Sequence, residues 1–261
     1  MIVAMMQPAF LPWQGFFGLL ASVDRFILLD DFQFSVQSYH QRNRLFVSPG
    51  KVDWCTAHVL KSASFAQPLN RTLTNEKVPW RRKLWKRIQQ NYRRAAFFER
   101  LGADVEQWLL RPATSLATQN MEFIRWAARL MGFDAELRLS SERPSDLTRS
   151  DRVVDLLRWG GATTYRAARG SFGYMKEDGV FPVADLPAVF QDFQPQPYLQ
   201  VGSPSAFVPC LSVLDALLNI GPAATARLIR VGTDHWVRWE ERVAGDEPAA
   251  SSFGVAPEGS I

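Results

Sequence analysis

The sequence predicts an α/β protein built on a mainly parallel sheet, with a helical insertion at about residues 78–131. The first observation is a pair of short apolar runs, at 1–6 and 25–29, each ended by polar residues as is typical of buried strands. Between them, residues 15–23 carry apolar side chains at helical spacing. Strand-like and helix-like segments then alternate along the chain, which favours helices packed on a sheet.

Segments after the insertion extend this sheet. Three helices are predicted within the insertion. The elements predicted after it are strands near 137–141, 163–166 and 189–193, a helix over 151–159, a glycine-punctuated loop over 168–174 and a buried helix over 207–221. We therefore expect a single domain over residues 1–240. The small and polar residues of 241–261 predict a disordered tail.

Composition argues against several classes of protein. No apolar run approaches the roughly 18 residues of a membrane-spanning helix, and the N-terminus lacks the charged start and long apolar core of a signal peptide. Two cysteines, Cys55 and Cys210, are too few for a disulfide framework, so we expect a cytoplasmic protein. The three histidines are far apart in unlike contexts, so we expect no metal site. No cofactor is expected either.

Polar side chains follow the first two predicted strands. Gln7 ends the first strand, and Asp30, Asp31 and Gln33 follow the second. Because functional groups of open parallel sheets lie at the carboxyl ends of the strands, we place the site there. Consecutive strand residues face opposite ways, so one aspartate is expected in the site, and Asp31 is preferred. The alternative for both aspartates is an ion pair that holds the following loop.

That loop, residues 35–45, holds the densest polar chemistry of the chain. His40 is the best candidate for a general base, because imidazole titrates near neutrality, and the alternative is a structural histidine. Arg42 and Arg44 alternate and can share a face that binds phosphate, pyrophosphate or carboxylate, with Asn43 between them. The alternative is a pair of structural arginines.

Two further candidates lie in the predicted loop over 168–174. Ser171 and Tyr174 stand next to Gly170 and Gly173, which allow close backbone approach to a phosphate or an oxyanion. An ordinary loop is the alternative. Cys55 and Cys210 lie in apolar strings, and we do not expect either to form a covalent intermediate.

Basic and aromatic residues interleave over residues 77–100. Arg81, Arg82 and Lys86 are expected to form a docking surface for an acidic acyl carrier protein or for aminoacyl-tRNA, while the aromatic residues face inward. A solvated helix face is the alternative. Sequence-specific recognition of nucleic acid is not expected, because no known DNA- or RNA-binding module is visible.

Several segments, taken together in their order, resemble the WbqC-like protein family. They are Gln7-Pro8 with Phe10-Leu-Pro-Trp and Gly15-Phe16, Asp30-Asp31-Phe-Gln-Phe34, Arg42-Asn-Arg44, the helix of residues 85–92 with Arg93-Arg-Ala-Ala-Phe-Phe98, Ser140-Ser141-Glu142, Asp151-Arg152, Gly161-Ala-Thr-Thr-Tyr165, and Phe207-Val-Pro-Cys-Leu-Ser-Val-Leu-Asp215 with 219–222. The resemblance spans about residues 5–230. It implies transfer of a glycyl or other acyl group to an amine in O-antigen or natural-product biosynthesis.

This chain departs from the family pattern at two places. The family commonly has a Ser-Gly-x-x-Gly-type loop where this chain has the sequence RAARGSFGY after Tyr165, and a Tyr-Pro-Gln where it has Tyr198-Leu-Gln200. The substrate or donor can therefore differ. At the level of the fold alone, the N-terminal unit is Rossmann-like and similar to that of nucleotidylyltransferases with a His-x-Gly-His motif. Trp13 and Phe16 stand where both histidines would be.

The resulting hypothesis is an acyl- or aminoacyl-transferase that forms an amide on a small-molecule amine, with a carrier-protein thioester as donor. His40 is the base, and Asp31 orients it or binds the amine. Arg42 and Arg44 hold an anionic group, and Gln7, Ser171 and Tyr174 are expected to donate or accept hydrogen bonds. Two alternatives stay open: a nucleotide-handling enzyme on a nucleotidylyltransferase-like fold, and a non-catalytic binding or assembly protein.

Overall fold

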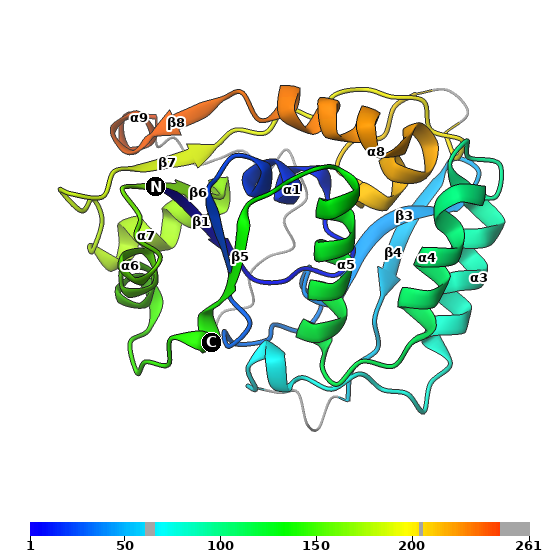
Figure 1. Ribbon diagram of the computed structural model, residues 1–261, viewed down its shortest axis with the longest axis horizontal. Coiled ribbons are helices and arrows are strands. Elements are labelled where there is room, and N and C mark those ends of the chain that lie inside the picture. The colour runs from blue at the N-terminus through cyan, green and yellow to red at the C-terminus, as the bar shows by residue number, and fades with distance from the viewer. Residues whose placement is uncertain (61–65, 204–205, 246–261) are drawn as a thin grey trace.

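The computed structural model describes residues 1–60, 66–203 and 206–245, and is centred on a six-stranded sheet (Figure 1). The strand order is β5-β2-β1-β6-β7-β8. The strands are β1 (Ile2–Met6), β2 (Arg25–Leu28), β5 (Glu136–Leu139), β6 (Thr164–Ala167), β7 (Ala188–Gln191) and β8 (Trp236–Arg238). The first five are parallel and β8 is antiparallel to β7. The predicted α/β class and mainly parallel sheet are confirmed.

Helices cover both faces of this sheet because side chains alternate along its strands. On β1, Ala4 faces the core that contains α1 (Gln14–Ala21) and α8 (Val213–Gly232). Val3 and Met5 face a second core, with α6 (Arg149–Trp159) and α7 (Phe172–Asp178). The apolar runs of the strands therefore reflect burial on two sides, as parallel sheets require.

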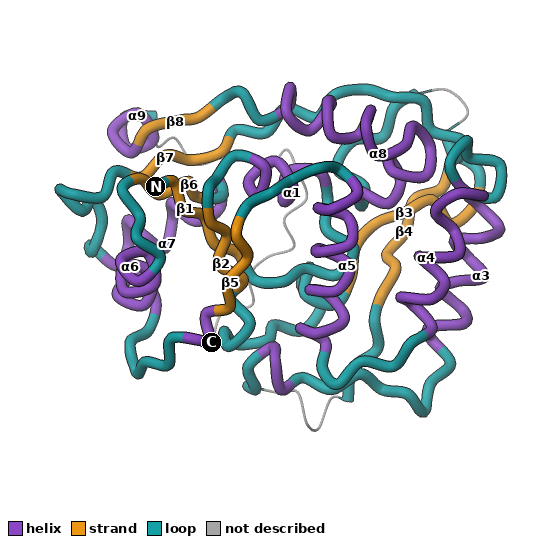
Figure 2. The backbone as a smooth tube through the Cα atoms, viewed as in Figure 1, coloured by secondary structure: helices purple, strands orange, loops and turns teal. Residues whose placement is uncertain are grey.

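The connection from β2 to β5 contains a hairpin and the predicted helical insertion. The hairpin strands are β3 (Arg42–Ser48) and β4 (Lys51–Thr56), and the helices are α3 (Trp80–Tyr92), α4 (Phe98–Leu110) and α5 (Leu116–Leu130). Figure 2 shows the three helices beside the hairpin, away from β7 and β8. Phe46, Leu84 and Ile88 join the α1/α8 core, so the insertion is continuous with it.

Three sequence-based boundaries differ from the structure. The predicted loop over 168–174 contains a short 3-10 turn and the start of α7, because Phe172 and Met175 are buried one turn apart. The helix predicted over 207–221 is α8, which begins at Val213 after the N-cap Ser212 and extends to Gly232. The helix α9 (Trp239–Ala244) extends into the predicted tail, whose residues 246–261 lie outside the described residues. No helix of the described residues is both long and apolar enough to cross a membrane.

A kink divides α8 at Gly221, which has φ 79° and ψ 168° and precedes Pro222. This conformation is accessible almost only to glycine. A Cβ at residue 221 would also overlap the ring of Phe97, from the turn before α4. The insertion therefore packs against the backbone of α8 at this point.

We expect Gly221→Ala to lower the free energy of unfolding by at least about 2 kcal/mol, because it adds both backbone strain and overlap with Phe97. Urea denaturation measures the change. The control is Gly179→Ala at the C-terminus of α7, where φ is also positive but no atom lies near the added Cβ, and where the expected loss is about 1 kcal/mol. Equal losses in the two variants would contradict the role assigned to Phe97.

Candidate functional site

A cavity of about 280 Å³ opens at the carboxyl ends of β1, β6 and β7. Between β1 and β6 the strand order reverses, and this is where open α/β sheets bind their ligands. Most of the wall is apolar. The lining residues are Met6, Trp13, Gly15, Phe16, Tyr39, Arg44, Ala168, Arg169, Gly170, Gln191, Phe193, Pro195 and Cys210. We call this cavity the switch-point pocket.

The start of α1 forms one rigid side of this pocket. The indole of Trp13 lies over Gly15 so closely that any Cβ at residue 15 would overlap it. The same ring packs edge-to-face on Phe193, with the ring centres 5.2 Å apart. The buried Gln191 side chain of β7 donates a hydrogen bond to the Gly15 carbonyl at 3.0 Å, which fixes the first turn of α1 to the sheet.

Arg44 supplies uncompensated positive charge to the pocket. Its guanidinium donates to the Cys210 carbonyl at 3.4 Å and has no ion pair among the described residues. The other lining arginine, Arg169, is neutralised by Asp192 at 2.7 Å. Burial raises the pKa of the Cys210 thiol despite the opposing charge of Arg44, so this thiol is neutral at pH 7. The pocket is therefore suited to an apolar group with an anionic or polarised oxygen.

Gln7, Gln33 and His40 come together at the end of β1, as expected from their places in the sequence. The Ser35 amide donates to Nδ1 of His40 at 3.3 Å, which assigns the ring proton to Nε2, and Nε2 donates to Oε1 of Gln7 at 2.7 Å. Nε2 of Gln7 donates to the Gln33 carbonyl at 3.1 Å. Burial lowers the pKa of His40, which is 8% exposed, to about 4. Both ring nitrogens are engaged, which favours the structural alternative over a base.

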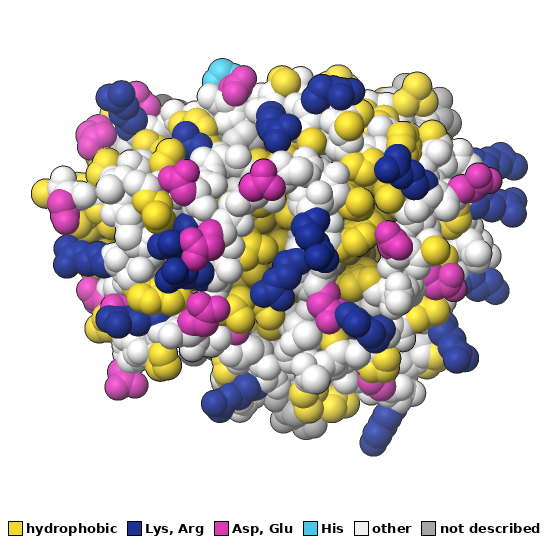
Figure 3. Space-filling model, in the orientation of Figure 1, with side chains coloured by type: hydrophobic (Ala, Val, Ile, Leu, Met, Phe, Trp, Pro, Cys, Tyr) yellow, Lys and Arg dark blue, Asp and Glu magenta, His cyan; other side chains and the backbone are white. Residues whose placement is uncertain are grey.

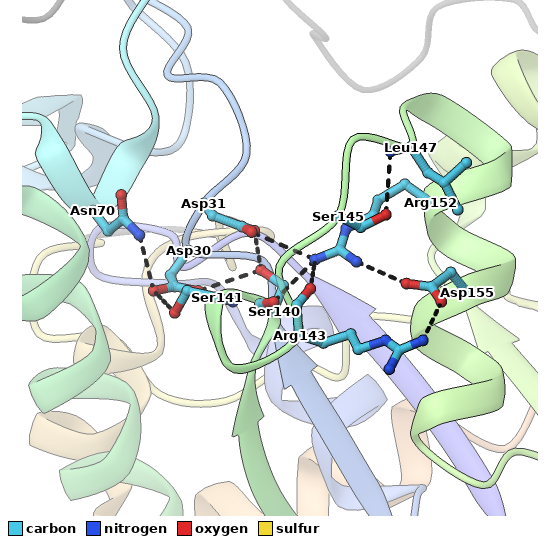
Figure 4. A network of polar contacts seen from close by, with 10 residues as sticks. All are labelled: Asp30, Asp31, Asn70, Ser140, Ser141, Arg143, Ser145, Leu147, Arg152 and Asp155. Atoms are coloured by element: carbon cyan, nitrogen blue, oxygen red, sulfur yellow. Dashed lines mark hydrogen bonds and ion pairs between the residues drawn. The ribbon is translucent and has the colours of Figure 1, made fainter.

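Asp30 and Asp31 lie in a separate network at the ends of β2 and β5 (Figure 4). Asp30 accepts hydrogen bonds from Ser141 Oγ at 2.8 Å and from the Ser141 amide at 3.1 Å. Asp31 accepts a hydrogen bond from Ser140 Oγ, which also approaches Asp30 at 3.3 Å. Neither aspartate lines the switch-point pocket. Both are approached by Ser140 Oγ, because β2 ends at Leu28 and the two residues lie in the turn after it and not at alternating strand positions.

Arg152 of α6 completes this network. Its guanidinium lies 3.5 Å from the Asp31 carboxylate and 2.8 Å from the Asp155 carboxylate. It also donates a hydrogen bond to the Ser140 carbonyl at 3.0 Å. Its side chain is only 4% exposed. The network therefore joins β2, β5 and α6, and its carboxylates are held by Arg152 and by the hydroxyl and amide groups of Ser140 and Ser141. Among the contacts of the described residues, neither aspartate pairs with His40, Arg42 or Arg44.

The other predicted site residues are distributed over both faces of the sheet. Arg42 stacks on Trp54 at 4.2 Å, and Asn43 is buried and accepts from the Arg44 amide at 2.9 Å. Ser171 and Tyr174 hydrogen-bond to the hydroxyl of Tyr165, whose pKa is raised well above its usual value by burial in the α6/α7 core. The predicted site residues therefore do not form one site, and among them Arg44 lines the switch-point pocket.

The assignment of Arg81 to a docking surface is wrong, because this side chain is 5% exposed. It pairs with Glu76 at 2.8 Å, donates to the Leu109 carbonyl at 2.9 Å and to Oε1 of Gln119 at 2.5 Å, and stacks on Trp80. It thus ties α3 to α4 and α5. Arg82 and Lys86 are exposed, as predicted.

A buried network that was not predicted from the sequence surrounds Asp215 of α8. This carboxylate accepts hydrogen bonds from the hydroxyls of Tyr92 and Tyr198, at 2.8 and 2.6 Å, and from Gln200 at 2.9 Å. Burial raises the pKa of Asp215. Gln14, next to the pocket residue Gly15, hydrogen-bonds to Tyr198. In the sequence, residues 198–200 and 207–215 were noted only in the comparison with the family. That they contact each other could be seen only in the folded structure.

The His40 geometry makes stability depend on pH. At His40 the folded protein binds fewer protons than the unfolded chain between about pH 6.5 and pH 4. The contribution of the neutral His40 ring to the free energy of unfolding is therefore fully present above pH 6.5 and is lost as the pH is lowered through this window. We expect the wild type to lose about 2 kcal/mol more between pH 7 and pH 5 than His40→Gln does. Urea denaturation at both pH values tests this. The control His58→Gln, at an exposed position, should keep the wild-type pH dependence.

Removal of Arg81 should affect folding directly. Arg81→Met leaves the Leu109 carbonyl and the Gln119 amide without their donor, and we expect it to lower the free energy of unfolding by about 2–4 kcal/mol. The neighbouring exposed control, Arg82→Met, should stay within about 0.5 kcal/mol of wild type. Urea denaturation of the pair measures both values. Similar stability of the two variants would show that the buried contacts of Arg81 contribute little.

Comparison with known proteins agrees with this arrangement of motifs. The model of the WbqC-like protein family matches residues 7–227. An uncharacterized protein, Rv1507c of Mycobacterium tuberculosis, is 28% identical over 228 residues, which cover 85% of this chain and 95% of the relative. No solved structure matches the chain. The matched region begins at Gln7 and includes the strand ends, the insertion and α8 up to Arg227, so the chain belongs to the WbqC-like protein family.

Proposed function

We propose that this chain is an N-acyl- or N-aminoacyl-transferase that forms an amide on a small-molecule amine, and that the acyl group binds in the switch-point pocket. The observation that carries the proposal is Arg44, which has no ion pair among the described residues and lies in the wall of a mainly apolar cavity at the point where the strand order reverses. An amino sugar or a natural-product intermediate is the acceptor class. The free thiols of Cys55 and Cys210 support a cytoplasmic location.

The pocket offers what acyl transfer from a thioester requires. The amine nitrogen attacks the carbonyl carbon, a C–N bond forms, and the carbonyl oxygen becomes an oxyanion before the C–S bond breaks. The guanidinium of Arg44 is the donor placed to stabilise that oxyanion or an anionic part of the acyl group. The apolar wall formed by Trp13, Phe16 and Phe193 limits access of water to the thioester.

This reaction does not need a strong base from the protein. An amine that enters in its neutral form attacks directly, and the departing thiolate takes the proton that the amine nitrogen loses. The geometry of His40 fits this route, because its neutral ring donates to Gln7 and accepts from Ser35. His40 and Gln7 then hold the loop that carries Tyr39, a lining residue of the pocket.

The strand order also favours a second candidate, a nucleotide-handling enzyme. Rossmann-like sheets bind phosphate groups at the first turn of the helix that follows their first strand. In this chain the indole of Trp13 covers Gly15 in that turn, and no histidine is present at Trp13 or Phe16. The pocket at this position is therefore more suited to an acyl group than to a triphosphate. Calorimetry with nucleoside triphosphates distinguishes the two candidates, because tight binding would favour the second.

The test is an assay of amide formation from N-acetylcysteamine thioesters and a panel of amino sugars and amines, followed by mass spectrometry. We expect Arg44→Met to lower kcat/KM by about 10²–10³-fold, the effect of removing an oxyanion donor. The control is Arg230→Met, an arginine of α8 that stacks on Phe133 outside the pocket, and it should retain wild-type activity. Wild-type turnover by Arg44→Met, or no amide from any pair of substrates, would contradict the proposal.

A further inference from the structure

The solvent side of α3 is strongly basic. Six exposed residues of α3 and the two positions after it form what we call the α3 basic face: Arg82, Lys83, Lys86, Arg87, Arg93 and Arg94. The helix has no acidic residue, and none of the six is ion-paired within the described part of the chain. In Figure 3, Lys and Arg side chains gather along the right-hand edge, where Figure 1 places α3.

The stability of the fold does not account for this face. Arg82 and Lys83 lie in the first turn of α3, at the positive end of the helix dipole, where acidic residues are favoured. Arg82 and Lys86 are four residues apart, as are Lys83 and Arg87, so like charges repel along the helix surface. Within the described residues no carboxylate is ion-paired with any of these four basic groups. Positions that oppose local stability in this way are expected to serve binding.

The inward side of α3 indicates what kind of partner fits. Trp80, Trp85 and Tyr92, which interleave with the basic residues in the sequence, are all buried in the core. No ring from this set is therefore available to stack on a nucleic-acid base, as single-stranded RNA recognition commonly requires. The exposed face offers charge alone. A surface of this kind is suited to the acidic helix of a protein.

The length of the α3 basic face and its connection to the pocket suit the binding of an acidic helix. From Arg82 to Arg93 it extends about 16 Å along the helix axis, the length of about three helical turns. Tyr92 of α3 donates to Asp215 at 2.8 Å and accepts from the Phe46 amide of β3 at 3.2 Å. The strand β3 also carries Arg44 into the switch-point pocket. The basic face and the pocket are thus joined through one strand.

We propose that the α3 basic face is the docking surface for a small acidic carrier protein that delivers the acyl group as a thioester. The inference rests on the proposed transferase function, whose donor it identifies. Docking between a basic and an acidic surface is steered by long-range attraction and weakens as salt is added.

The experiment measures binding of a fluorescently labelled acyl carrier protein, in its holo form without an acyl group, by anisotropy. The test variant is Arg82→Glu/Lys86→Glu. The matched control is Arg125→Glu/Arg227→Glu, which changes the net charge equally at exposed positions of α5 and α8. At 50 mM salt we expect micromolar binding to the wild type and the control, and at least tenfold weaker binding to the test variant. Binding to the wild type should also weaken at least tenfold at 300 mM salt.

Equal weakening in the two double variants, or no binding of the carrier protein to the wild type at 50 mM salt, would overturn the proposal. Binding of bulk tRNA, lost in the test variant while the carrier protein does not bind, would overturn it in favour of a nucleic-acid partner. Transfer from N-acetylcysteamine thioesters separates docking from chemistry, since these donors need no docking. If the wild type binds the carrier protein but transfers no acyl group from these thioesters, the transferase function is disproved and the surface remains a binding site.

Discussion

The pairing of β1 with neighbours on both sides is the constraint on which the rest of the molecule depends. Val3 of β1 is in register with Arg25 of β2 on one side and with Tyr165 of β6 on the other. The chain leaves β1 through α1 toward β2, whereas β6 begins the other half of the sheet after the insertion and β5. The connections that follow β1 and β6 therefore run in opposite directions along the sheet, which leaves room between the carboxyl ends of these two strands, and the pocket forms there.

Three networks of buried polar groups cross between elements of the described chain. Asp215 holds α3 and the 198–200 segment to α8, Arg152 holds β2 and β5 to α6, and His40 holds its loop to β1. Each network leaves its members with few free donors or acceptors, as burial requires. Arg44 differs from these structural clusters, because in the described part of the chain its guanidinium makes one long hydrogen bond to a carbonyl, and this distinguishes the pocket.

Local sequence pattern was sufficient for much of the fold and little of the site. The runs around Val3 and Ile27 identified buried strands, because burial on both faces makes a strand apolar throughout. The pattern could not show that Arg81 faces inward, since its partners Leu109 and Gln119 come from two other helices. Cys210, in the pocket wall, lies 204 positions after Met6 in the sequence, and no local signal connects the two.

The short outer strands have a consequence for behaviour at high concentration. The sheet ends in β5, with four residues, and in β8, with three. Unpaired amides and carbonyls at a sheet edge are templates for association with other chains, and short or charged edges limit it. Arg138 on β5 and Arg238 on β8 add charge to both edges. Short strands with a charged side chain at both edges are thus expected to limit edge-to-edge association of the sheet at high concentration.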